Sequence, residues 1–165
     1  MKSLLLLTLS SLASARFGQE GAVQSVIQGL SAFGPPGQAG ALAGKTPGVL
    51  LAGASACAKL ELADEIVTVL GNDPEVIAGA AVLVAAEKNF NPFAQSVPTL
   101  CDNAALPVTA ALRGIVPLVD PAVAGADVQN ANSAASLQAA FDDAGLSVAA
   151  ISTEQGFSNF TAQAV

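Results

Sequence analysis

The fold is decided by residues 57–101, which read CAKLELADEIVTVLGNDPEVIAGAAVLVAAEKNFNPFAQSVPTLC. Apolar side chains recur at helical spacing in the first part, and Gly71 follows them where a helix-terminating glycine belongs. Asp73 and Pro74 then supply a capping side chain and a proline suited to the first helical position. The stretch therefore predicts two antiparallel helices joined by a short turn, the second of which reaches Glu87–Lys88.

The ends of this stretch are Cys57 and Cys101, the two cysteines of the chain. An even number of cysteines in a secreted protein indicates a disulfide framework, and two cysteines allow a single pairing. Closing a loop of this length stabilises a fold by about 4 kcal/mol in the chain-entropy model. Two buried free thiols are the alternative.

The N-terminal residues are typical of a secretory signal peptide. Lys2 precedes the apolar run Leu4–Leu7, and the small residues Ala13-Ser14-Ala15 follow. A membrane anchor is the alternative, but the apolar run is much shorter than the roughly 20 residues that span a bilayer. We expect a signal peptide at residues 1–15 and one mature domain at residues 16–165. That domain would have no transmembrane segment and would be secreted.

The composition favours closely packed helices and disfavours several classes of partner. Hydrophobic residues make up 52% of the chain, but aromatic residues only 4%, all of them phenylalanine. A composition that is rich in hydrophobic residues but poor in aromatic ones suits helix–helix packing better than a β-sandwich. With a net charge of −7 and six Lys and Arg residues, the chain would release few counterions from a phosphate backbone. We therefore expect no nucleic-acid partner, and an anionic membrane is disfavoured for the same reason.

Further helices are predicted on both sides of the 57–101 stretch. The apolar periodicity indicates helices at residues 17–33, 38–43, 107–118, 127–143 (in its second half) and 148–155. In the 127–143 segment, Leu137, Ala140 and Phe141 are expected to face inward. Thr46-Pro47 is read as the start of another helical segment, and Ser147 as the cap of the last helix. The predicted fold class is all-α, a compact bundle of six or seven short helices with one disulfide and no clear strand.

The residue types of common catalytic and metal sites are missing or dispersed. The chain has no histidine, and paired cysteines leave no thiolate, so zinc and nucleophilic triads are disfavoured. Glu61, Asp64 and Glu65 fit a solvated helix face better than an acidic site, and residues 120–127 are too apolar for a calcium loop. Sugar clefts are usually lined with aromatic rings, and the chain has no Trp or Tyr. We expect no enzyme activity, cofactor or metal.

Four phenylalanines in predicted loops form two pairs, Phe90 with Phe93 and Phe157 with Phe160. They either close the ends of an alanine-rich core or form a surface for a partner or lipid. Asn159 begins the chain's Asn-x-Thr sequon and is a candidate glycan acceptor.

Arg113 is expected on an apolar helix, where a carboxylate would be its partner. Asp102 and Asp120 are the candidates, and an anion site is the alternative.

Four segments resemble small secreted proteins of filamentous ascomycete fungi. They are Asn89–Phe93, Pro98–Cys101, Leu112–Pro121 and Gly156–Thr161. The resemblance covers most of the mature chain and implies a secreted fungal protein of the cell wall or of host interaction. It defines no activity and assigns no site residue.

These observations favour a non-enzymatic secreted protein that acts at the fungal cell surface or in host interaction, effector-like or associated with the wall. Its partner would be a host or cell-wall component. The alternative is an extracellular carrier that holds a fatty acid, a sterol or another apolar molecule in a cavity of the bundle. A hydrolase that uses acidic residues is a third hypothesis.

Overall fold

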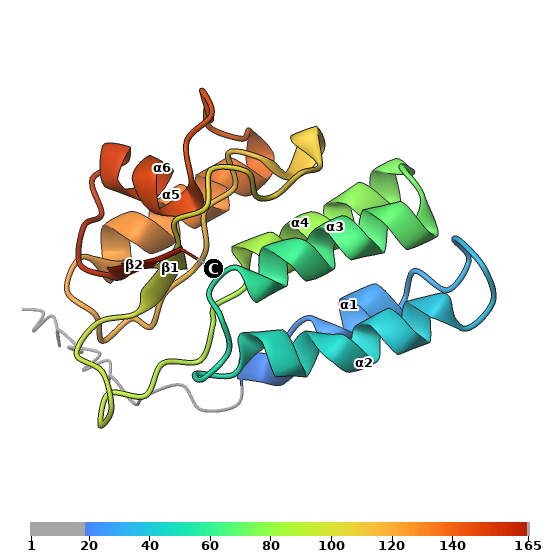
Figure 1. The fold of residues 1–165 in the computed structure, drawn as a ribbon, viewed down its shortest axis with the longest axis horizontal. Coiled ribbons are helices and arrows are strands. Elements are labelled where there is room, and N and C mark those ends of the chain that lie inside the picture. The colour runs from blue at the N-terminus through green and yellow to red at the C-terminus, as the bar shows by residue number, and fades with distance from the viewer. Residues whose placement is uncertain (1–18, 165) are drawn as a thin grey trace, which may run out of the picture.

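The computed structural model describes residues 19–164, so the predicted signal peptide at residues 1–15 lies outside the described range. The described part contains six α-helices, two 3₁₀-helices and two short strands (Figure 1). In chain order these are η1 (Gln19–Gly21), α1 (Gln24–Gln28), α2 (Gln38–Leu50), α3 (Ala58–Leu70), α4 (Pro74–Ala85), β1 (Thr99–Cys101), η2 (Ala110–Leu112), α5 (Ala126–Gln138), α6 (Val148–Glu154) and β2 (Thr161–Gln163). The all-α class is confirmed. Among these residues, no helix combines the length and the apolar character that crossing a membrane requires.

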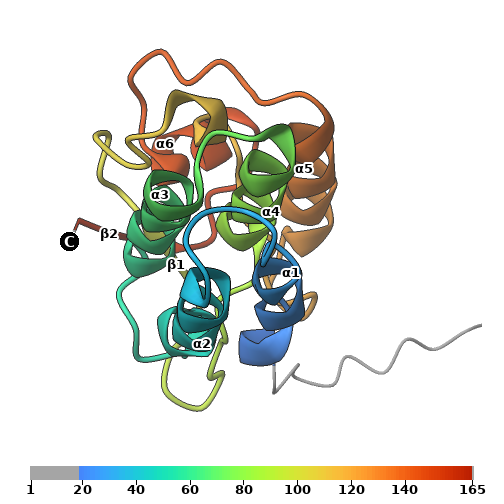
Figure 2. The same cartoon turned by 90° about the vertical axis from the view of Figure 1, so that its right-hand side faces the viewer.

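Helices α1 to α4 pack around the larger of two hydrophobic clusters. Figure 2 looks along these four helices and shows them side by side, with α5 and α6 on the far side of α3 and α4. Ile27 of α1, Leu42 of α2, Ile66 of α3 and Leu83 of α4 are fully buried in this cluster. Alanines such as Ala63 and Ala80 lie between them, and their small size brings the helix axes close together.

The α3–α4 hairpin is confirmed. Helix α3 ends at Leu70, and Gly71 follows with a φ of 100°, a backbone conformation that favours glycine. The Asp73 side chain accepts a hydrogen bond from the Glu75 N–H at 3.0 Å, and Pro74 is the first residue of α4. Helix α4 ends at Ala85, slightly earlier than predicted.

A second, smaller cluster lies under β1, α5 and α6. Its buried members are Leu100, Val119, Val123, Ala126, Ala149 and Phe157. Beside it, β1 and β2 form a parallel pair in which Thr99 is opposite Thr161 and Cys101 is opposite Gln163. The sequence did not predict these strands, because three residues are too few for an alternating pattern to be visible.

The prediction that a new helix starts at Thr46-Pro47 is wrong, because α2 continues through both residues. A proline inside a helix leaves the carbonyl four residues earlier without its donor. For Pro47 that carbonyl belongs to Ala43, and the Thr46 hydroxyl donates to it at 2.8 Å. The buried threonine thus replaces the missing bond within the helix.

The predicted helix at 107–118 is also wrong, since only Ala110–Leu112 form a 3₁₀ turn there. Gly114 has a φ of 77°, and a Cβ at this position would lie 2.0 Å from the Phe141 carbonyl oxygen. With this conformation and this close approach, the chain does not continue as a helix through Gly114. Pro117 lacks a backbone donor and follows within the same extended segment.

Two other predicted helices differ in their bounds. Of the predicted helix at 17–33, residues 19–33 are described, and among these only Gln19–Gly21 and Gln24–Gln28 are helical. Helix α5 starts earlier than predicted and ends at Gln138, so Ala140 and Phe141 lie beyond it, and Leu137 is 41% exposed rather than inward-facing.

Candidate functional site

The four candidate phenylalanines do not share one surface. Phe157 is 1% exposed in the smaller cluster, and the ring of Phe160 stacks on it with a centroid distance of 5.7 Å. Phe90 is partly buried against the same cluster. Phe93 is 92% exposed. Phe157 therefore belongs to the core, whereas Phe93 is exposed, as the surface for a partner or lipid requires.

Phe93 lies in a loop, residues 89–98, whose two ends are fixed. At its start, the Asn89 N–H donates to the Leu50 carbonyl at 2.8 Å. At its end, the Pro98 carbonyl accepts from the Thr161 N–H at 2.8 Å. Residues 91–96 between these contacts are all exposed, and none is charged. We call residues 89–98 the Phe93 loop.

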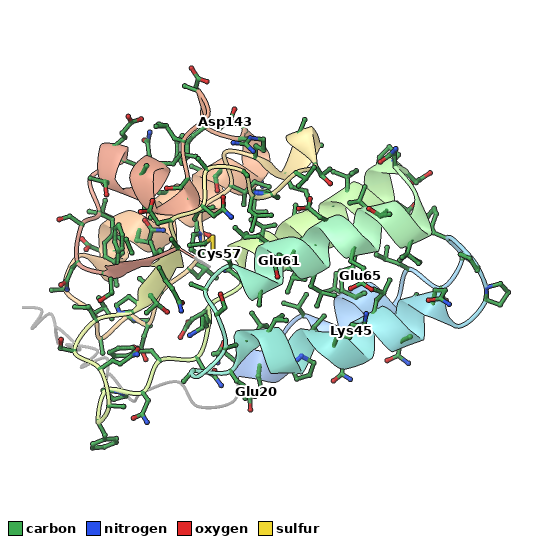
Figure 3. The ribbon with its side chains drawn as sticks, in the orientation of Figure 1. Glu20, Lys45, Cys57, Glu61, Glu65 and Asp143 are labelled. Carbon is green, nitrogen blue, oxygen red and sulfur yellow. A yellow bond between two sulfur atoms is a disulfide. The ribbon has the colours of Figure 1, made fainter. Side chains whose placement is uncertain are left out.

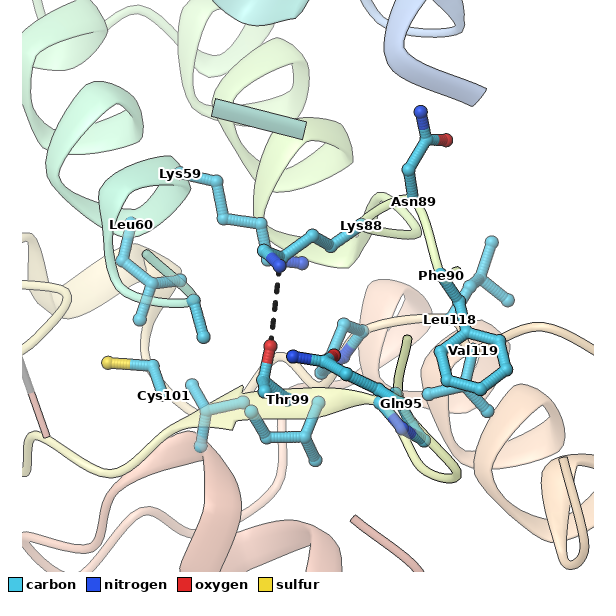
Figure 4. A pocket seen from close by; sticks show the side chains of 15 residues that line it. Lys59, Leu60, Lys88, Asn89, Phe90, Gln95, Thr99, Cys101, Leu118 and Val119 are labelled. Carbon is cyan, nitrogen blue, oxygen red and sulfur yellow. Dashed lines mark hydrogen bonds between the residues drawn. The ribbon is translucent and has the colours of Figure 1, made fainter. Parts of the chain in front are cut away.

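A small pocket, lined by two lysines and otherwise mostly by apolar side chains, lies where α3 begins and α4 ends, against β1 (Figure 4). Its cavity volume is about 20 Å³. Lys59, in the first turn of α3, is buried at 4% exposure and donates to the carbonyls of Val84 at 2.8 Å and Ala86 at 2.6 Å. Val84 lies in the last turn of α4 and Ala86 is its C-cap residue, and at this end a helix leaves its acceptors without intrahelical donors. Lys59 thus caps the neighbouring helix.

The pocket contains a second lysine. The Lys88 amino group donates to the Ala52 carbonyl at 2.7 Å and to the Thr99 hydroxyl at 3.3 Å. The pKa of Lys59 is lowered to about 7, chiefly by burial and to a smaller extent by Lys88, while Glu87 acts in the opposite direction. Burial also lowers the pKa of Lys88.

The position of Lys59 in the sequence indicates this pocket, although the predictions from the sequence did not include it. Lys59 lies three, four and seven residues before Leu62, Ala63 and Ile66, all of which are buried. A lysine on the apolar stripe of a helix is rarely buried without partners.

The acidic residues of α3 lie apart, as expected for an ordinary helix face (Figure 3). Glu61 is exposed, and Glu65 forms an ion pair with Lys45 of α2 at 2.5 Å. Asp64 differs, because its carboxylate accepts the backbone N–H groups of residues 108 and 109 at 2.7 and 2.8 Å. Among the described residues, no cluster of carboxylates and cysteines is arranged to hold a metal ion.

The prediction that Arg113 pairs with Asp102 or Asp120 is wrong. Its guanidinium forms an ion pair with Asp143, and one terminal nitrogen donates to the Pro107 carbonyl at 2.9 Å. The prediction failed because residues 107–118 are not a helix, so the nearest carboxylates in sequence are not nearest in space. The hydrogen bond from Arg113 holds the pKa of Asp143 below its ordinary value.

The disulfide between Cys57 and Cys101 is confirmed, with both cysteines buried and their Cα atoms 4.8 Å apart. Asn159 is half-buried, and its side-chain amide donates to the Ala124 carbonyl at 3.2 Å, while Thr161 of the same sequon is exposed. Glycosylation of Asn159 stays a prediction.

A second surface pocket, of about 150 Å³, lies between η1, α4 and α5 and is lined in part by Val23, Val82 and Leu137. Both pockets are smaller than the roughly 300–1,000 Å³ of typical small-molecule sites.

No family model, curated protein or solved structure matches this chain. The geometry of the described residues is therefore what bears on its function.

Proposed function

We propose that this chain is a non-enzymatic secreted protein that acts at the fungal cell surface or in host interaction through the Phe93 loop. The observation that carries the proposal is the 92% exposure of Phe93 on a loop held at both ends. A ring exposed to this extent contributes little to the core and is accessible to a partner.

An exposed phenylalanine suits a binding role for energetic reasons. A phenylalanine side chain gains about 1.5–3 kcal/mol on full burial. Aromatic side chains are also common among the few residues that dominate binding energy at interfaces. Because the loop ends are already fixed by hydrogen bonds, less conformational entropy is lost on binding.

The chemistry of the loop indicates the kind of partner. Residues 91–96 carry no charge, so the contact is apolar at its centre and hydrogen-bonding at its edges, where Asn91, Gln95 and Ser96 lie. A cell-wall component or a host protein with an apolar recess fits this surface. An anionic polymer does not, because the loop offers it no cation.

The test compares two secreted variants in which one exposed apolar side chain becomes polar. Phe93→Ser removes the proposed contact, and Val108→Ser is the matched control, because Val108 is 73% exposed and lies elsewhere on the molecule. Each purified protein is incubated with isolated fungal cell walls and with host surface extract, and the bound fraction is measured. We expect Phe93→Ser to weaken retention by about 10- to 100-fold, as the burial energy predicts, and Val108→Ser to match the wild type.

Equal retention of all three proteins would contradict the proposal. Thermal unfolding followed by circular dichroism shows that both variants keep the wild-type fold, since neither side chain is buried.

A further inference from the structure

The pocket that contains Lys59 and Lys88 carries positive charge in an acidic protein. Two lysines and no Asp or Glu line it. The two other cations among residues 19–164 are already in ion pairs, Lys45 with Glu65 and Arg113 with Asp143. Half of the described cations therefore converge on one small cavity.

The hydrogen bonds of the two amino groups are incomplete when both are charged. A lysine ammonium has three N–H donors. Lys59 uses two of them on the carbonyls of residues 84 and 86, and Lys88 uses two on Ala52 and Thr99. Figure 4 shows both amino groups directed to the same region above Thr99. One N–H of each ammonium is thus left without a protein acceptor, and for Lys59, which is buried, such a charged donor is costly.

We propose that this pocket binds one small monovalent anion, which accepts a hydrogen bond from the amino groups of Lys59 and Lys88. The cavity of about 20 Å³ holds a single particle of the size of water. That size admits a chloride ion or one oxygen of a small carboxylate, whereas a whole sulfate or phosphate ion is too large. Gln95 and Thr99 add polar groups at the lining, while Asn89 directs its amide to Glu20 at 2.5 Å. The site does not depend on the proposed role of Phe93.

Binding is coupled to pH, because an anion favours the charged form of Lys59. The charged groups that act on Lys59 are Lys88, which lowers its pKa, and Glu87, which raises it. The pocket residues contributed by β1 and the Phe93 loop are uncharged. Since the pKa of Lys59 is about 7, affinity is stronger at pH 6 than at pH 8.

Chloride-35 NMR tests the site on the full secreted protein, because bound chloride broadens the bulk resonance. The variant is Lys88→Gln, which keeps hydrogen-bond donors but removes one charge from the pocket. The control is Lys45→Gln, which removes one charge from an exposed ion pair. We expect several-fold less excess line width for Lys88→Gln, no change for Lys45→Gln, and a decrease in the wild type from pH 6 to pH 8.

Added formate identifies the source of the anion. Its displacement of chloride assigns the site to carboxylates as well as halides, and failure to displace assigns it to halides, so the site stands in either case. Equal line widths for wild type and Lys88→Gln, or an equal loss in Lys45→Gln, would overturn the proposal. If Lys88→Gln does not fold, wild-type crystals soaked in sodium bromide decide the question, because an anomalous peak must appear beside both lysine amino groups.

Discussion

At the scale of single residues, Lys59 is the most informative side chain. A neutral lysine amine has two N–H donors, and the two carbonyls at the end of α4 accept both. The folded protein therefore accommodates the neutral form without loss of hydrogen bonds. The charged form has a third donor and is buried, which is why the pKa falls to about 7.

The lowered pKa of Lys59 predicts an unusual pH dependence of the free energy of unfolding. The folded-state pKa of Lys59 is about 7 and lies below the ordinary lysine value of 10.5, so the unfolded chain binds this proton more tightly. The free energy of unfolding should therefore rise as pH increases from about 7 towards 10, by a few kcal/mol at most. Urea unfolding at pH 7 and pH 9.5, followed by circular dichroism, measures the rise.

Two variants assign the effect to this side chain. Lys59→Met should flatten the pH dependence, whereas Lys45→Met, which alters an exposed lysine, should preserve it. A wild-type midpoint that stays constant over this range would show that Lys59 keeps its proton in the folded state.

At the scale of elements, α5 shows how a helix can be buried through polar side chains. Its inward positions are Ala126, Gln129, Ser133 and Ser136. Gln129 donates to the Pro117 carbonyl at 2.8 Å, and Ser136 accepts from the Val116 N–H at 3.2 Å. These side chains supply the extended segment 116–119 with the hydrogen bonds that a neighbouring strand would otherwise make.

Replacing Gln129 by leucine should therefore destabilise the fold despite its higher hydrophobicity. The Pro117 carbonyl would lose its donor inside the protein, at a cost of about 1–3 kcal/mol. Gln138→Leu is the control, because it makes the same chemical change at an exposed position of the same helix. Chemical denaturation of the two variants should give a lower midpoint for Gln129→Leu alone, and equal midpoints would refute the role assigned to Gln129.

The elements that could be predicted from sequence are those with local signals. The α3–α4 hairpin was predicted correctly because Gly71, Asp73 and Pro74 determine its turn without help from distant residues. The bounds of α5 were not predicted correctly. Its buried face contains Gln and Ser, and apolar periodicity does not detect such a face. The break in the predicted helix at Gly114 could not be predicted either, because the group that constrains this residue is the Phe141 carbonyl, which is distant in sequence.

At the scale of the whole molecule, the Cys57–Cys101 bridge connects the start of α3 to β1. The Cys57→Ala/Cys101→Ala double variant should lose about 4 kcal/mol of stability, because the loop of 44 residues gains entropy in the unfolded state. Urea unfolding of the double variant measures the loss. A difference below about 1 kcal/mol would mean that residual structure in the unfolded chain already restricts this loop.

The candidate site could be predicted only in part. The sequence identified the disulfide and placed Phe93 among four phenylalanines, but which of them is exposed depends on the packing of β1, α5 and α6. The lysine pocket was missed for a similar reason, since Lys59 and Lys88 meet only after the hairpin closes and β1 adds Thr99.

The parallel pairing of β1 with β2 also sets an order in time. Contacts within α1 to α4 are mostly between neighbours in sequence, and such contacts form early. Strand β1 must instead wait for residues 161–163, about 60 residues later, which at ribosomal speed takes roughly 3–12 s. During that interval the edge of β1 and the Ala56 N–H, which later donates to Gln163, lack their final acceptors. The segment around Cys101 is therefore the last part of the chain to gain its partners, after the helical half can fold and before the last strand has been made.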